Sequence, residues 1–173
     1  MSLFNSLMTV SPIARIRRHH ALEHATLHVL AKTNPHVSIL GYSDVRGFWI
    51  IGNLSTESVR DGVEEALSRL REGETQLAIH PNCGTNLVVT GLIAGSLAWL
   101  TASFSKGDWR KRLQDWPLVI AASTLGVAVG HPLGLLLQAR VTTDARPGDM
   151  KVTEIVVYQL RGVCAHRVVT RHT

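Results

Sequence analysis

The sequence of 173 residues is poor in charge, in cysteine and in aromatic side chains. Charged residues make up 18% of the chain, below the roughly 25% of soluble domains, whereas hydrophobic residues make up 45%. This composition excludes a disordered chain and indicates that part of the protein does not face water. The two cysteines exclude a disulfide scaffold. The formal charge of +5 is scattered and lacks the dense basic stripe of a nucleic-acid-binding protein, so we expect no nucleic-acid partner.

The first 20 residues lack the order of parts that defines a cleaved export signal. Their apolar stretch is short and is interrupted by Asn5 and Ser6. The basic residues Arg15, Arg17 and Arg18 follow this stretch instead of preceding it. We therefore expect no cleaved signal peptide.

Two long stretches carry no Lys, Arg, Asp or Glu. They are residues 87–104 and 116–139, and the only ionisable side chain in either is that of His131. Stretches of this length predict membrane-spanning helices. Tryptophan is typical of the membrane–water interface, and three tryptophans lie near the ends of the stretches: Trp99, Trp109 and Trp116. The sequence therefore predicts a two-helix transmembrane hairpin, with two buried helices of a soluble oligomer as the alternative.

Glycines recur at intervals of four in both apolar stretches. Small residues at this spacing let helix backbones approach closely in lipid. We expect tight packing within the hairpin, extended to a homodimer or a membrane-protein partner. Pro132 should kink the second helix or interrupt its hydrogen bonding near His131. The glycines concerned are Gly91, Gly95, Gly126, Gly130 and Gly134.

The regions on either side of the hairpin show patterns of both helix and strand, so the predicted class is α+β. We expect a small α/β domain over residues 1–85, a transmembrane hairpin over 86–139 and a β-rich tail over 140–173 that packs on the first domain. The expected elements are helices from Ser11 to about Lys32 and from Thr56 to Glu72, and strands at 37–40, 47–53, 76–79, 152–160 and 163–170. The segment between the first two strands is expected to be a turn.

The orientation of the hairpin is poorly determined by the positive-inside rule. The connecting loop and the outer flanks carry similar numbers of basic residues. We expect a multi-pass protein of the cell inner membrane with both termini in the cytoplasm, since no export signal precedes the folded N-terminal region. The basic residues are Lys106, Arg110, Lys111 and Arg112 in the loop, and Arg69, Arg71, Arg140, Arg146 and Lys151 in the flanks.

His20, Glu23 and His24 form an H-x-x-E-H motif in the first predicted helix. Residues four apart on a helix point the same way, so both imidazoles can reach one metal ion. Glu23 can lean toward a metal-bound water and act as a general base. This is the arrangement of the inverted zinc-peptidase motif. The motif therefore predicts zinc ligands at His20 and His24 and a catalytic role for Glu23.

The position of the two histidines on the helix supports this prediction. His20 and His24 share an arc of about 80° with the apolar residues Ile13, Ile16 and Leu27. Imidazoles on an apolar face need partners, and a shared metal ion would supply one for both. The alternative is a pair of core histidines bonded to the backbone or to each other.

The neighbouring histidines of this helix are expected at the surface. His19 points away from the arc of His20 and His24. His28 lies one turn beyond His24 and could join the site, but the sequence favours a surface position for it as well.

The third metal ligand is expected in the motif HPNCGTN, which contains His80 and Cys83. Imidazole and thiolate are both ordinary zinc ligands. If both bind, the site is closed and structural, and if one binds, a position stays open for water. The alternatives are a plain turn capped by Asn82 and Asn86, or a nucleophilic Cys83 with a histidine base.

His131 is an ionisable residue inside a predicted membrane helix. It could ligate a metal ion or haem, relay protons, or bond to a backbone carbonyl released by Pro132. The sequence favours the last. The remaining candidates carry no functional argument: His36, His166 and His172 in a loop or tail, and Cys164 as a packed strand residue.

The chain resembles a family of small bacterial membrane proteins known only as a domain of unknown function. The resemblance rests on the segments HHALEHATLHVL, GETQLAIHPNCGTNLVVTGLIAG and GHPLG. It implies a membrane protein and no particular activity. The five residues of H-x-x-E-H alone resemble the inverted zinc peptidases, whose glutamate third ligand has no clear match here.

These patterns lead to one favoured function and two alternatives. The favoured function is a membrane metalloprotein with a zinc site at the membrane surface, and with hydrolase or peptidase activity if Glu23 activates a zinc-bound water. The first alternative is a non-catalytic membrane scaffold or complex subunit. The second is haem or electron-transfer chemistry through His131.

Overall fold

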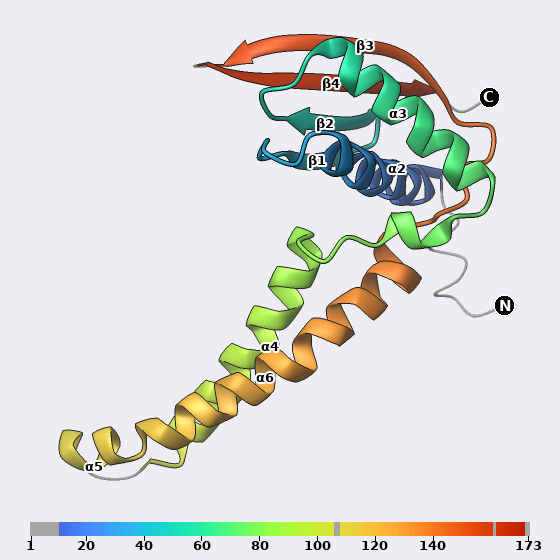
Figure 1. The fold of residues 1–173 in the computed structure, drawn as a ribbon. Coiled ribbons are helices and arrows are strands. Elements are labelled where there is room, and N and C mark those ends of the chain that lie inside the picture. The colour runs from blue at the N-terminus through green and yellow to red at the C-terminus, as the bar shows by residue number, and fades with distance from the viewer. Residues whose placement is uncertain (1–10, 106–107, 161, 172–173) are drawn as a thin grey trace, which may run out of the picture. The chain divides into compact units, whose positions relative to one another are not determined.

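The computed structural model describes residues 11–105, 108–160 and 162–171. Lys106 and His172 lie outside these ranges. The chain divides into two compact units (Figure 1). One unit comprises the chain up to His80 and from Ala139 onward, and we call it the α/β unit. The other, Pro81–Gln138, is the hairpin unit.

The α/β unit is built on an antiparallel sheet of four strands. These are β1 (Leu40–Asp44), β2 (Gly47–Ile51), β3 (Lys151–Leu160) and β4 (Val163–Arg171), in the order β1-β2-β4-β3. The C-terminal strand β4 therefore lies between β2 and β3, and Phe48 of β2 pairs with Val168 of β4. The expected strands of the tail are confirmed, as is the α+β class.

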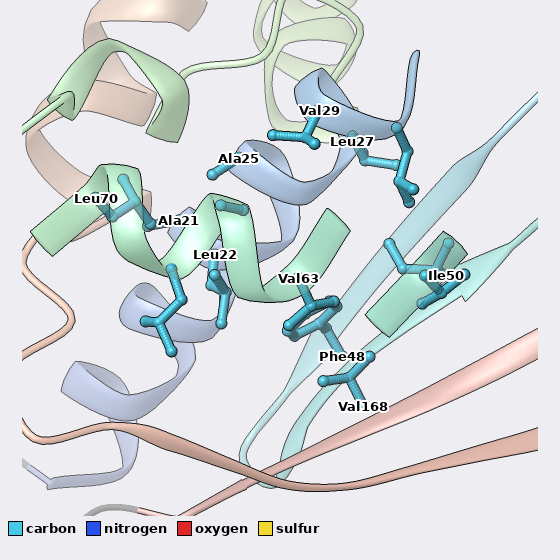
Figure 2. Packing of buried hydrophobic residues seen from close by; sticks show 14 of the residues in the cluster. Ala21, Leu22, Ala25, Leu27, Val29, Phe48, Ile50, Val63, Leu70 and Val168 are labelled. Carbon is cyan, nitrogen blue, oxygen red and sulfur yellow. The ribbon is translucent and has the colours of Figure 1, made fainter. Parts of the chain in front are cut away.

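Two helices cover one face of this sheet, α2 (Ser11–Thr33) and α3 (Thr56–Arg71). Leu22 of α2 and Val63 of α3 pack with Phe48 and Val168 in a fully buried core (Figure 2). Each large apolar side chain buried in this way stabilises the fold by about 2 kcal/mol. A Cβ at Gly62 of α3 would lie 2.7 Å from the Leu30 side chain, so this glycine sets how closely the helices approach.

Helix α3 begins and ends where the sequence predicts. The Ser55 hydroxyl caps its first turn by accepting a hydrogen bond from the Ser58 backbone at 3.1 Å. After Arg71 the chain turns through Gly73, which adopts a φ of 96° that favours glycine. Helix α2 likewise covers the expected range and ends before Asn34 and Pro35.

Two predicted strands are wrong in position or type. The first expected strand, 37–40, gives way to β1, which occupies the segment expected to be a turn. The turn shrinks to Val45 and Arg46, because the Asp44 side chain accepts from the Arg46 backbone N–H at 2.7 Å and Gly47 takes a φ of 141°.

The expected strand at 76–79 is instead a 3-10 turn, Thr75–Ala78. The carbonyl oxygens of Ala78 and Ile79, which a strand would offer to a neighbour, accept hydrogen bonds from histidine side chains of α2. Hydrogen bonds from histidine side chains thus take the place of the backbone hydrogen bonds that a strand would make with its neighbour.

The hairpin unit contains α4 (Gly84–Ser103), the short α5 (Trp109–Gln114) and α6 (Trp116–Leu137). After α6 the chain enters the α/β unit through a π-helical turn, Gln138–Thr142. Helix α6 does not end at Pro132. A Cβ at Gly126 or Gly130 would lie 2.5 or 2.8 Å from the Cα of Ala94 or Thr90 on α4. The glycines of α6 therefore allow the two helices to pack closely.

The other pair of glycines does not take part in this packing. A Cβ at Gly91 or Gly95 would have open space around it, and both residues line an outward groove with Trp99. Two helices among the described residues, Gly84–Ser103 and Trp116–Thr142, are long and apolar enough to cross a membrane by length and composition.

Candidate metal centre

Helix α2 brings its histidines into the interior of the α/β unit. From His19 to Leu30 nearly every residue is buried, and only His20 and His28 are partly exposed. The apolar arc predicted from the sequence is looser at its start, where Ile13 and Ile16 are 38% and 37% exposed. The candidate site therefore lies along the buried middle of the helix.

His20 and His24 lie side by side, with ring centroids 4.2 Å apart. The Nδ1 of His20 is 3.1 Å from the Thr142 carbonyl oxygen, and the Nδ1 of His24 is 2.8 Å from the Ala78 carbonyl oxygen. A carbonyl oxygen only accepts, so each Nδ1 is the donor and the lone pair of the neutral ring is on Nε2. Carbonyls that orient imidazoles in this way are typical of metal-binding histidines.

His28 and His80 extend the group. The Nε2 of His28 donates to the Ile79 carbonyl at 2.9 Å. The His80 ring centroid lies 4.9 Å from that of His28 and 5.7 Å from that of His24. We call these four residues, His20, His24, His28 and His80, the histidine cluster. His28 belongs to the cluster and is half-buried, so the expected surface position is wrong.

The surroundings of His80 favour its neutral imidazole. Burial, and after it positive charge on His28 and His24, lowers the pKa of His80 to about 4. His80 is therefore neutral at pH 7. Neutral imidazole is the form that binds metal ions.

Glu23, the predicted catalytic residue, is buried and turned toward the sheet. Its carboxylate accepts a hydrogen bond from the Ser43 hydroxyl of β1. A Cβ at Gly41, also in β1, would overlap the Glu23 side chain, so only glycine leaves room for this carboxylate. These contacts hold the carboxylate against β1.

His19 is not a surface residue, contrary to the prediction. It is 1% exposed, and its Nδ1 donates to the Asp44 carbonyl at 2.7 Å. Its Nε2 accepts from the Thr170 hydroxyl at 2.6 Å. Because His19 lies 100° around the helix from His20, it faces β1 and β4 and cross-links them. Both ring nitrogens of His19 therefore bond to the sheet, and His19 is not part of the histidine cluster.

Cys83 stands at the N-cap of α4 in the hairpin unit, three residues after His80, and forms no disulfide. His20 and His24 offer two imidazoles within the α/β unit, and Cys83 offers a thiol at the start of the hairpin unit. Imidazole and thiolate are residue types that suit zinc among the common biological metals.

The remaining candidates differ in burial and in the elements that carry them. His131 is exposed on α6, and Cys164 is half-buried in β4. His166 was expected in a tail without a role, but it is fully buried in β4 with its Nε2 3.4 Å from the Thr56 hydroxyl. Strand alternation from Val168 would have placed His166 on the buried face.

The sequence model of a family described as "Domain of unknown function (DUF6391)" matches residues 15–155. An uncharacterized protein of Picosynechococcus sp. is 35% identical over 149 residues, which cover 81% of this chain and 71% of that protein. No solved structure matches the chain.

Proposed function

Because the chain belongs to the DUF6391 family, whose function is unknown, we propose its function from its own residues: a membrane-anchored protein that binds zinc at the membrane surface. The observation that carries the proposal is the orientation of His20 and His24. Two adjacent imidazoles on one helix face each donate Nδ1–H to a backbone carbonyl, which makes Nε2 the atom of each ring that would bind a metal ion.

Cys83 is the third ligand in this proposal. It follows His80 by three residues, so their Cα atoms are at most about 11 Å apart along the chain. His80 itself packs beside His24. A His2Cys set leaves the fourth position of a tetrahedral zinc ion open to water, whereas an additional bond from His80 would close the site. We assign the open form.

The membrane part of the proposal rests on the surface of the hairpin unit. Only 6% and 17% of the two apolar windows are buried, whereas a core helix of a soluble protein is mostly buried. The carbonyl that orients His20 belongs to Thr142, the last residue of the apolar helix that starts at Trp116. Chain continuity therefore favours a metal site close to the membrane surface. We retain the inner membrane and cytoplasmic termini as part of the proposal.

Metal content is the direct test. Purified without chelators in detergent, the full chain should carry about one zinc per chain by elemental analysis. His20→Ala and His24→Ala should each lose it, whereas His36→Ala, which removes an exposed loop histidine, should keep it. Equal zinc in all four proteins, or none in the wild type, would overturn the proposal. Cys83→Ser should also lower the zinc content, and His80→Ala should not.

A hydrolase is the finer form of this proposal. When bound, zinc lowers the pKa of its water ligand toward neutrality. Glu23 would accept the proton from that water, and its hydrogen bond from Ser43 would keep the carboxylate in place. We expect Glu23→Gln to keep its zinc and to lose hydrolysis of a fluorogenic peptide library by about 10²-fold or more. An equally active Glu23→Gln protein would exclude this role.

A membrane scaffold is the second candidate, and the outward groove at Gly91 and Gly95 favours it. A second copy of the chain or another membrane protein would pack a helix there. Under this proposal Gly91→Leu with Gly95→Leu converts a dimer to monomer in light scattering of the detergent complex, and His20→Ala with His24→Ala leaves the assembly intact. A monomeric wild type would argue against a homodimer.

A further inference from the structure

Five arginines lie in two segments of the α/β unit, the start of α2 and the chain that follows α6 in sequence. Three lie in the first turns of α2, and two lie in the segment that follows the hairpin. We call them the arginine collar: Arg15, Arg17, Arg18, Arg140 and Arg146.

Hydrogen bonds and an ion pair hold the two segments together. Arg17 Nη2 donates to the Thr143 carbonyl at 3.0 Å and to the Arg140 carbonyl at 3.4 Å. The Asp144 backbone N–H donates to the Arg17 carbonyl at 3.0 Å, and the Asp144 carboxylate lies 3.8 Å from Arg18. The two segments that carry the collar are therefore joined in the folded α/β unit.

The arginines of the collar outnumber the acidic side chains that could neutralise them. Asp144 pairs with both Arg18 and Arg146, and Asp149 is the other acid of the segment. Five arginines against two aspartates leave a formal charge of +3. Arg15 and Arg140 are exposed, and neither makes an ion pair within the part of the chain that the structure describes.

The collar also has a defined place along the chain. Arg140 lies in the π-helical turn that prolongs α6, three residues after Leu137 and inside the last part of the apolar span Trp116–Thr142. An arginine at the end of a membrane helix extends its guanidinium to the headgroup layer. Clusters of four to eight basic residues next to a membrane helix are typical binding sites for anionic lipids.

We propose that the arginine collar binds the phosphodiester headgroups of anionic phospholipids. The inference rests on the proposed membrane insertion of α6 but not on the zinc site. Arg17 binds backbone carbonyls and Arg18 pairs with Asp144, so these two side chains hold the two segments of the collar together. The exposed Arg15 and Arg140 would contact the lipid phosphate. Lipid binding would hold the start of α2, and with it the histidine helix, at the membrane surface.

The test uses the delipidated full chain in a neutral detergent and counts bound lipid by native mass spectrometry. Phosphatidylglycerol should bind at least tenfold more tightly than phosphatidylcholine with the same acyl chains. Each arginine near an anionic surface contributes about fivefold in affinity, so Arg15→Gln with Arg140→Gln should weaken phosphatidylglycerol binding about 30-fold. The matched control, Lys32→Gln with Arg60→Gln, removes two exposed charges elsewhere in the α/β unit and should change affinity less than twofold.

Three further measurements separate the outcomes. Arg15→Lys with Arg140→Lys should restore most of the binding, because the interaction depends on charge. Equal binding of the two lipids, an unchanged affinity in the double glutamine variant, or displacement of lipid by equimolar inorganic phosphate or by an RNA oligonucleotide would overturn the proposal. Extraction of membranes with alkaline carbonate tests membrane insertion independently of lipid binding, because an inserted chain resists extraction. A resistant chain without lipid preference refutes the collar alone, and an extracted chain refutes the membrane proposal as well.

Discussion

The two units of this protein place large and small side chains in opposite ways. In the α/β unit the largest buried side chains are Phe48 and Leu22, and buried histidines are bonded among them. In the hairpin unit the buried positions of α6 are glycines, Gly126, Gly130 and Gly134, and that of α4 is Asn86. Its large apolar side chains point outward, with Leu92 and Trp99 68% and 71% exposed. Burial of apolar side chains away from water drives the first arrangement. The second is the arrangement expected of the proposed membrane hairpin, since small residues let helices approach closely in lipid.

The comparison shows that different kinds of contact determine how each unit packs. The α/β unit depends on polar contacts between elements far apart in the sequence, such as that of His19 with Thr170. The hairpin unit depends on the absence of side chains at its helix contact. Substitutions should therefore act by different physical means in the two units.

The largest effect is expected from filling the hairpin contact. In Gly130→Leu the new side chain would meet Thr90 of α4, whose Cα lies 2.8 Å from the position of a Cβ. We expect the free energy of unfolding in detergent to fall by about 3 kcal/mol, since overpacked contacts force backbone shifts. Tryptophan fluorescence during denaturant titration measures it.

The matched control is Gly91→Leu, where a Cβ meets open space, and its free energy of unfolding should stay within about 0.5 kcal/mol of the wild type. If both variants lose the same stability, the two glycine faces of the hairpin are equivalent and the assignment is wrong.

A smaller effect is expected where β1 makes room for Glu23. Gly41→Ala places a methyl group against the Glu23 carboxylate and should cost about 2 kcal/mol in free energy of unfolding. In a Glu23→Ala background the same change should cost less than half as much. Circular dichroism of thermal unfolding in all four proteins completes the double-mutant cycle. If the two losses of unfolding free energy simply add in the double variant, the new methyl group at position 41 does not clash with the Glu23 side chain.

The smallest effect concerns pH and His166. Burial lowers the pKa of His166 from its ordinary 6.5, so the native protein holds this ring neutral. The contribution of His166 to the free energy of unfolding is fully present above about pH 6.5. It is lost as the pH falls below this value, because the unfolded chain binds the proton at a higher pH than the folded chain does. His166→Gln should flatten the decline below pH 6.5 by at most about 1.4 kcal/mol per pH unit. His36→Gln, at an exposed loop, should leave the slope unchanged.

Much of the secondary structure was predictable because its signals are local. Ser55 and Gly73 mark the ends of α3, and the uncharged stretches mark α4 and α6 by composition alone. The pairing of His20 with His24 follows from helical spacing. The errors lie where a distant partner overrides a local pattern, as at Thr75–Ala78, whose neighbouring carbonyls bond to histidines of α2.

Within the candidate site, the sequence identified residue types but not their surroundings. It offered no sign that His19 is a buried cross-link or that His28 packs against His80. Adjacent histidines of one helix face different neighbours, and those neighbours come from other elements. Only Gly41, an unremarkable residue in the sequence, reveals how closely β1 passes Glu23.

The sequence by itself determined the helices, the apolar hairpin and the face of α2 that carries His20 and His24, because side chains three or four residues apart decide these features. The tertiary structure alone decided what each imidazole bonds to. The partners of His24 and His20 lie 54 and 122 residues away, at Ala78 and Thr142. A local pattern contains no information about such carbonyls, since their positions depend on how the chain closes over the helix.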